Sequence, residues 1–255
     1  MFRTVKLFLV VFLALALFAC ASSSQSTKRT NKQQADSHYK LAMAHLQAKN
    51  PTMALKELLT AEKQDPENSE ILVALAQTYQ RKKAYSLAEE KYLKALELSK
   101  NDPRYQNNLA ALYLDTKQWD KAIYYFDLAS KNLLFVKAHV AIAGKAYAYY
   151  KKMDYKKALG YVTEAISLAP NYAKAYLLKS QIYKEMGDPA QEKFFLQRTV
   201  DVAPYFIGAR YQLAELFLRE NSLDKAREQL QTIVDYAPTS EVGRNAEVLL
   251  KSLSK

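Results

Sequence analysis

The residues from Ser69 to Asp102 read SEILVALAQTYQRKKAYSLAEEKYLKALELSKND, and this stretch decides the fold. Small residues at Ala76, Ala88 and Ala95 alternate at helical spacing with large ones at Tyr79 and Tyr92. Alanine lets two helix backbones approach closely, and the large side chain fills the hole beside it. The stretch therefore predicts a pair of packed helices.

The same pattern returns along the chain with a step of 34 residues. The first helix of each unit carries a small residue, at Ala42, Ala76, Ala110, Ala146, Ser180 and Ala214. A larger ring follows three positions later, at His45, Tyr79, Tyr113, Tyr149, Tyr183 and Phe217. The second helix repeats three columns: Ala54, Ala88, Ala122, Ala158, Glu192 and Ala226; Leu58, Tyr92, Phe126, Val162, Leu196 and Leu230; and Ala61, Ala95, Ala129, Ala165, Thr199 and Ile233. Prolines at 66, 170, 204 and 238 keep the same register.

These columns resemble the tetratricopeptide repeat (TPR), a helix-turn-helix unit that stacks into a solenoid. We predict six units, over residues 35–68, 69–102, 103–138, 139–172, 173–206 and 207–240. The final residues, 241–255, predict a capping helix with Val242, Ala246, Leu249, Leu250 and Leu253 facing inward. The expected fold is all-α, a right-handed α-solenoid of six repeats. The small number of glycines, five in the chain, agrees with a helical fold.

Two departures from the repeat are visible. The third unit is two residues longer, and we place the excess in residues 131–136, whose apolar side chains are expected to pack across the junction to the next unit. In the fourth and fifth units Lys145 and Lys179 replace the usual leucine, and Glu192 stands where alanine is expected. Packing is therefore expected to be less regular there.

The first 19 residues have the features of an export signal, with basic Arg3 and Lys6 followed by an apolar run from Leu7 to Ala19. Cys20, which comes next, is the only cysteine, so no disulfide is available. The run Leu17-Phe18-Ala19-Cys20 resembles the lipobox of bacterial lipoproteins, which implies a lipid anchor on Cys20. A chance cysteine in a signal peptide is the alternative. Residues 20–34 are polar and predict a flexible tether.

By the TPR resemblance, the first helix of each unit lines the concave face of the stack. The outward positions of these helices give a candidate partner-binding groove that is aromatic and apolar with scattered amides. Its residues are Tyr39, Met43, Gln77, Arg81, Asn107, Ala111, Leu114, Tyr147, Tyr150, Gln181, Tyr211 and Leu218. The alternative for each tyrosine is that it only covers the neighbouring unit.

The sequence offers no catalytic, cofactor or metal site. His38, His45 and His139 are the only histidines, and none stands at a metal-ligand spacing from Cys, Asp or Glu. There is no glycine-rich phosphate loop and no nucleophile elbow. The formal charge of +11 suggests acidic partners or anionic lipid, because dispersed lysines mixed with glutamates do not form a nucleic-acid stripe. Neither nucleic acid nor a small-molecule substrate is expected.

A closer resemblance combines the lipobox, a short tether, six repeats and the run Asn107-Asn108-Leu109-Ala110-Ala111-Leu112-Tyr113-Leu114. Together with the lengthened third unit, these features are similar to the type IV pilus biogenesis lipoproteins known as PilF, PilW and Tgl. That resemblance implies a pilotin, which helps secretin subunits reach the outer membrane and multimerise. It also implies that the early units face the secretin, through Tyr39, Met43, Gln77, Asn107 and Leu114.

The expected location is the periplasmic face of the outer membrane, because Ala21 rather than aspartate follows Cys20. Two other functions stay open. One is a general periplasmic adaptor for cell-wall enzymes or outer-membrane assembly factors, and the other is a chaperone for exported chains. All three are non-enzymatic and bind protein.

Overall fold

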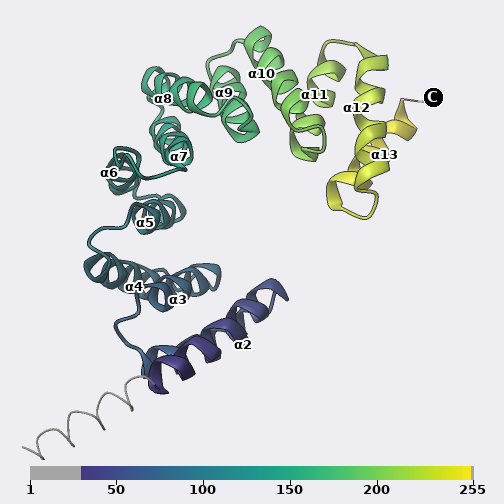
Figure 1. The fold of residues 1–255 in the computed structure, drawn as a ribbon. Helices are drawn as coiled ribbons and strands as arrows, with labels where there is room; N and C mark the ends of the chain where they lie inside the picture. The colour runs from purple at the N-terminus through teal and green to yellow at the C-terminus, as the bar shows by residue number, and fades with distance from the viewer. Residues whose placement is uncertain (1–29, 254–255) are drawn as a thin grey trace, which may run out of the picture. The chain divides into compact units, whose positions relative to one another are not determined.

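The computed structural model describes residues 30–253, and within this range it contains helices and turns but no strand. A helix over residues 30–47 comes first. The helices that follow are α2 (Pro51–Gln64), α3 (Ser69–Arg81), α4 (Tyr85–Leu98), α5 (Pro103–Asp115), α6 (Trp119–Ser130), α7 (Ala138–Lys151), α8 (Tyr155–Leu168), α9 (Ala173–Glu185), α10 (Pro189–Val202), α11 (Ile207–Arg219), α12 (Leu223–Tyr236) and α13 (Glu241–Ser252) (Figure 1). The described range has no helix whose length and hydropathy would let it cross a bilayer.

The predicted signal peptide, Cys20 and the tether up to residue 29 lie outside the described residues. Residues 30–34, also expected in the tether, are instead helical and continue into the first helix. The buried Ala35 and a hydrogen bond from Ser37 Oγ to the Gln33 carbonyl oxygen (3.0 Å) fix this end. Residues 32–34 are lysine and glutamine, which lose little side-chain freedom in a helix. They therefore continue the helix whose next residue, Ala35, is buried.

The chain divides into two compact units, the first ending at Leu112 and the second beginning at Tyr113, within α5. In each unit the helices pack mainly against their neighbours in sequence, α2 to α4 in unit 1 and α6 to α13 in unit 2. Helices two apart, such as α7 and α9, make lighter contacts. This nearest-neighbour stacking of helix pairs defines the α-solenoid class, which confirms the predicted fold class.

A residue in the left-handed region ends the first helix of each pair. The φ angles are +57° at Lys49, +60° at Lys83, +57° at Lys117, +63° at Met153, +73° at Gly187 and +55° at Asn221. These positions repeat with the sequence period, yet only one of them is glycine. The following helix is then capped in several pairs by a side chain, as where Asp188 Oδ1 accepts from the Gln191 N–H at 3.0 Å.

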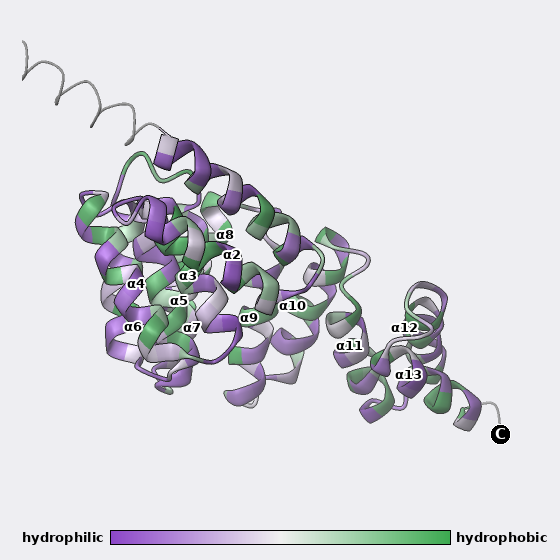
Figure 2. Ribbon diagram, turned by 90° about the horizontal axis from the view of Figure 1, so that it is seen from below, coloured by the Kyte–Doolittle hydropathy of each residue, from purple (hydrophilic) through white to green (hydrophobic). Residues whose placement is uncertain are grey.

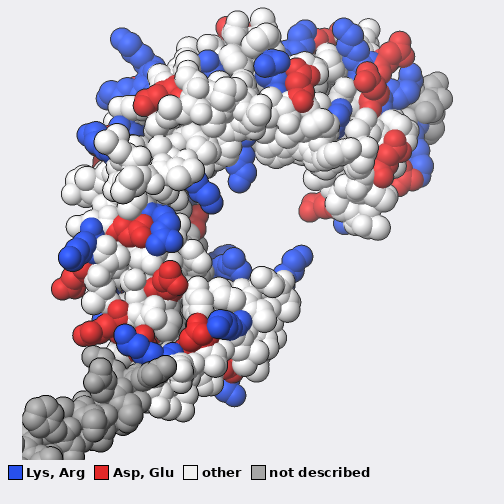
Figure 3. All heavy atoms as spheres, viewed as in Figure 1, with Lys and Arg blue, Asp and Glu red and all other residues white. Residues whose placement is uncertain are grey.

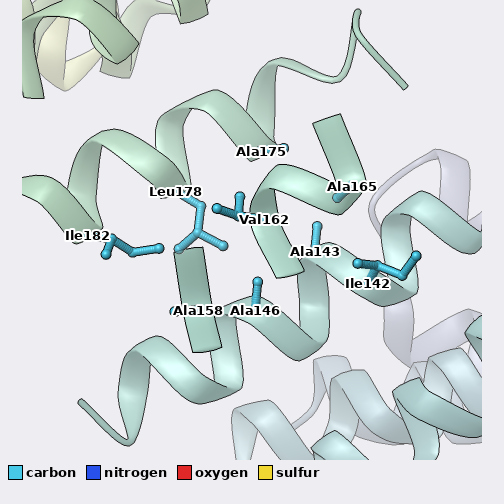
Figure 4. Packing of buried hydrophobic residues seen from close by; sticks show 9 residues of the cluster. All are labelled: Ile142, Ala143, Ala146, Ala158, Val162, Ala165, Ala175, Leu178 and Ile182. Atoms are coloured by element: carbon cyan, nitrogen blue, oxygen red, sulfur yellow. The ribbon is translucent and has the colours of Figure 1, made fainter. Parts of the chain in front are cut away.

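The repeated small and apolar columns form the core. Every residue of the first-helix small column and of the three second-helix columns is at most 5% exposed. Around Ala146, Ala158 and Ala165, the larger Val162, Leu178, and Ile182 fill the space between α7, α8 and α9 (Figure 4). Hydrophobic and hydrophilic stretches alternate along the helices (Figure 2), as expected for helices that bury one face.

Two of the three irregular positions, Lys145 and Glu192, form ion pairs. Lys145 Nζ lies 2.6 Å from Asp127 Oδ1 and 4.0 Å from the centre of the Tyr161 ring. Burial lowers the pKa of Lys145, but the hydrogen bonds and charge interactions with Asp127 and Tyr161 together outweigh it, so the pKa lies above its ordinary value. Glu192, which is 5% exposed, faces Arg219 Nη2 at 3.3 Å. A paired charge therefore replaces an apolar contact at Lys145 and at Glu192. Lys179 Nζ instead donates to Thr163 Oγ1 at 2.9 Å.

The lengthened junction departs from the prediction. Only Phe135 packs, at 8% exposed, whereas Leu133, Leu134 and Val136 are 101%, 88% and 92% exposed. The expectation that this apolar stretch packs across the junction is wrong for three of its four side chains. A tight pair of turns here leaves room for one side chain to point inward.

The last helix closes unit 2 as predicted. Ala246 of α13 is fully buried against α11 and α12, with Val242, Leu249, Leu250 and Leu253 packed around it. Arg227 of α12 also donates to the Leu253 carbonyl oxygen at 2.9 Å. The end of the stack is thereby covered by a helix with a polar outer face.

Candidate partner-binding surfaces

Unit 1 contains a hollow of about 250 Å³ between the helix at 30–47, α3 and α5. We call it the unit 1 hollow. Its lining mixes rings, aliphatic groups, amides and one charge of each sign: Tyr39, Met43, Glu70, Val73, Ala74, Gln77, Arg104, Tyr105 and Asn108. The three helices are the first helices of three successive pairs, the same helices from which the candidate groove was predicted.

The repeat period explains why these residues meet. Thirty-four residues separate Tyr39 from Val73, Met43 from Gln77, and Glu70 from Arg104. Positions one period apart occupy equivalent places on successive first helices, and stacking brings equivalent places side by side. Equivalent positions of successive repeats therefore line the hollow, but the residue type at these positions differs from one repeat to the next.

A charged group is held firmly at the edge of the hollow. The Arg104 guanidinium donates from Nε to both carboxylate oxygens of Asp102 at 3.1 Å, and from Nη2 at 2.7 Å. The hydrogen bond from Arg104 lowers the pKa of Asp102, which therefore stays ionised. The guanidinium carbon also lies 5.3 Å from the centre of the Tyr105 ring. Arg104 is thus oriented before any partner arrives.

The tyrosines of the hollow present hydroxyl groups within a lining of mixed polar and apolar groups. Burial, followed by the charge of Glu70, raises the pKa of Tyr39, so its hydroxyl stays protonated. Tyr105 Oη lies 3.5 Å from Ser69 Oγ. A rigid ring with a polar tip suits the recognition of a partner side chain and its backbone.

Three of the predicted groove residues, Tyr39, Met43 and Gln77, line the unit 1 hollow. Arg81 is exposed near the end of α3, and Ala111 is half-buried on α5. Asn108 lines the hollow rather than its neighbour Asn107, whose Oδ1 is buried and has no hydrogen-bond partner among the described residues. The hollow also contains residues that the sequence analysis missed, namely Glu70, Val73, Ala74, Arg104 and Tyr105. The 34-residue register from Tyr39 was the sequence signal that could have identified Val73.

The remaining predicted residues lie in unit 2. Tyr147 and Tyr150 have ring centres 6.0 Å apart, and the Lys151 ammonium lies 5.2 and 5.0 Å from them. Both rings also pack on the core of α7, α8 and α9. Leu114 and Gln181 are half-buried, whereas Tyr211 and Leu218 pack against the cores nearer the C-terminus. These side chains thus contribute to packing as well as to the surface.

The charges are mixed in sign. Figure 3 shows Lys and Arg interspersed with Asp and Glu on the face in view. Among residues 30–253, no group of three or more His, Cys, Asp or Glu could hold a metal ion. His38 instead contacts Glu57 Oε2 at 2.7 Å, and His139 packs edge-on against Tyr172.

Comparison with known proteins agrees with the repeat. The tetratricopeptide repeat family matches residues 39–103 and again residues 173–206. These two stretches therefore carry tetratricopeptide repeats, and the stacked helix pairs show the same architecture over the described residues.

The chain is also similar to proteins of type IV pilus biogenesis. It is 30% identical over 136 residues to the type IV pilus assembly protein PilF of Pseudomonas aeruginosa, covering 52% of this chain and 54% of PilF. The solved structure of PilF matches 86% of this chain and 99% of its own, with a TM-score of 0.67 at 18% identity. The solved structure of PilW, described as a widely conserved type IV pilus biogenesis factor, matches 83% of this chain and 97% of its own, with a TM-score of 0.71 at 17% identity.

The chain is also similar to part of a much longer human protein. Protein O-mannosyl-transferase TMTC3 is 25% identical over 230 residues, which cover 88% of this chain but 25% of that protein. The chain therefore matches about half the length of PilF and a quarter of TMTC3. The repeat fold is one that presents extended surfaces for binding protein partners.

Proposed function

We propose that this protein is a pilotin, an outer-membrane lipoprotein that promotes the localisation and multimerisation of the type IV pilus secretin. The observation that carries the proposal is the 30% identity to PilF over 136 residues. The helix pairs supply a binding scaffold, and the unit 1 hollow supplies a surface on which a partner segment can dock.

The hollow suits part of a protein rather than a free small molecule. Its volume of about 250 Å³ lies below the roughly 300–1,000 Å³ typical of ligand pockets. The half-buried Tyr39 and Met43 offer contact area for one or a few apolar side chains. Arg104 and Gln77 offer hydrogen bonds to a carboxylate or to backbone carbonyls at the edge. A secretin segment with an apolar anchor beside an acidic group is the ligand that this arrangement favours.

The membrane part of the proposal depends on Cys20. A diacylated cysteine anchors a protein firmly where a single acyl chain does not. Residues 21–29 would then link the anchor to the helix that begins at or before Thr30. On this proposal the lipid brings the hollow to the membrane in which the secretin assembles.

The test is deletion of the gene followed by complementation. We expect the deletion strain to lose pili and to hold its secretin as monomers, with multimers restored by the wild-type protein. Cys20→Ser should restore them poorly. Normal secretin multimers in the deletion strain would rule out the pilotin role.

A matched pair of variants tests the hollow. Met43→Lys places a charge in the hollow, whereas Leu41→Lys places the same charge on the same helix at a side chain that is 47% exposed. We expect Met43→Lys to reduce secretin multimers strongly and Leu41→Lys to leave them unchanged, at equal protein levels. Equal effects of the two changes would remove the hollow from the mechanism and leave the deletion result standing.

A further inference from the structure

The junction between α6 and α7 is an ordered loop. We call residues 131–137 the junction loop. The Phe135 N–H donates to the Asn132 carbonyl oxygen at 3.0 Å, and the Ala138 N–H donates to the Phe135 carbonyl oxygen at 3.0 Å. Asn132 Oδ1 also accepts from the Leu134 N–H at 2.9 Å. Two successive turns therefore hold the backbone of the loop in one conformation.

The two turns place one side chain of the loop inward and three outward. Phe135 is 8% exposed and anchors the loop to unit 2, whereas Leu133, Leu134 and Val136 are almost fully exposed. Single exposed apolar residues are common, but three together at the tip of an ordered loop are a typical mark of an interaction site. The anchored ring presents the three aliphatic side chains outward.

The charged residues next to the tip in the sequence are all lysines. Lys131 and Lys137 flank it directly, and residues 128–153 contain five lysines and no aspartate or glutamate. Lys131 pairs with Asp127 at the base of the loop, yet its side chain remains 73% exposed. A row of aliphatic groups between two lysines matches the layered chemistry of an anionic membrane, in which phosphate groups lie outside the acyl chains.

We propose that the junction loop inserts Leu133, Leu134 and Val136 into an anionic lipid surface, with Lys131 and Lys137 at the head groups. A bilayer accepts a protruding apolar tip without a complementary hollow, whereas a protein partner must provide one. The loop is a second membrane contact, separate from any lipid on Cys20. The proposal does not rest on the secretin role.

The experiment places an indole in the loop of the full-length protein. Leu134→Trp is combined with Trp119→Phe, which removes the only native tryptophan. The protein is reconstituted on vesicles of equal parts phosphatidylcholine and phosphatidylglycerol, with bromine atoms on the acyl chains as quenchers. Only sedimented, vesicle-bound protein is measured, so the result does not depend on how the N-terminus is attached. The matched control is Val248→Trp in the same background, at a position on α13 that is 67% exposed.

We expect several-fold stronger quenching of the loop indole than of the indole at position 248, with a blue shift of its emission. Quenching should fall in vesicles of phosphatidylcholine alone, and also when Lys131→Gln and Lys137→Gln are added. Unchanged circular dichroism would show that each variant is folded. Equal quenching of the two indoles, or a loop indole that is shielded only when outer-membrane proteins are added, would overturn the proposal.

Discussion

Met153 ends α7 with a φ of +63°, and its side chain is 73% exposed. A residue with a Cβ is strained in the left-handed region, and an exposed methionine gains little packing in return. We expect Met153→Gly to raise the free energy of unfolding by roughly 0.5–1 kcal/mol, because relief of strain exceeds the added freedom of the unfolded chain. Chemical denaturation of the purified protein measures the change.

Gly187 provides the reciprocal test, since it occupies the equivalent position one repeat later with a φ of +73°. An added Cβ there would meet nothing within 4 Å, so backbone strain is the only effect. Gly187→Ala should lower the free energy of unfolding by about 1 kcal/mol. If both changes shift stability in the same direction, left-handed strain does not govern these turns.

Individual residues of the site were only partly predictable. Tyr39, Met43 and Gln77 line one hollow together because helical period and repeat register fix the direction of a side chain along a first helix. Arg104 and Tyr105 escaped prediction because they lie in the first turn of α5, where the helix start had to be known. The pairing of Arg104 with Asp102 then sets its direction.

At the scale of elements, α6 and α7 approach so closely that glycine is required at one contact. A Cβ on Gly144 would lie 2.4 Å from Phe126 Cζ, and that ring is buried and unable to move away easily. We expect Gly144→Ala to lower the free energy of unfolding by about 1–3 kcal/mol through overpacking. Thermal unfolding followed by circular dichroism gives the shift in Tm.

Gly160 is the control for this contact, since it lies within α8 and an added Cβ meets nothing within 4 Å. Gly160→Ala should raise stability by up to about 1 kcal/mol, because alanine favours a helix over glycine. A destabilising effect of both alanines would show that helix propensity is not the relevant difference between the two sites.

At the scale of the whole molecule, a stack of nearest-neighbour contacts predicts that damage stays local. Ending the chain before Glu241 removes α13 and exposes the apolar faces of α11 and α12 that it covers. We expect amide hydrogen exchange to accelerate first in α11 and α12, while α3 and α4 keep their protection. A uniform loss of protection along the chain would mean that the repeats unfold as one cooperative block.

The sequence by itself determined the repeat, its helical columns and the closing helix, because burial with a fixed period is encoded in the order of small and large residues. Only the tertiary structure decided which charged side chains at the irregular positions form ion pairs. Lys145 and Glu192 are buried because Asp127 and Arg219 lie opposite them. The tertiary structure also decided that the unit 1 hollow joins three helices and that Leu133, Leu134 and Val136 face solvent. These contacts and exposures depend on which chain segments lie close together in space, and a local sequence pattern does not give that information.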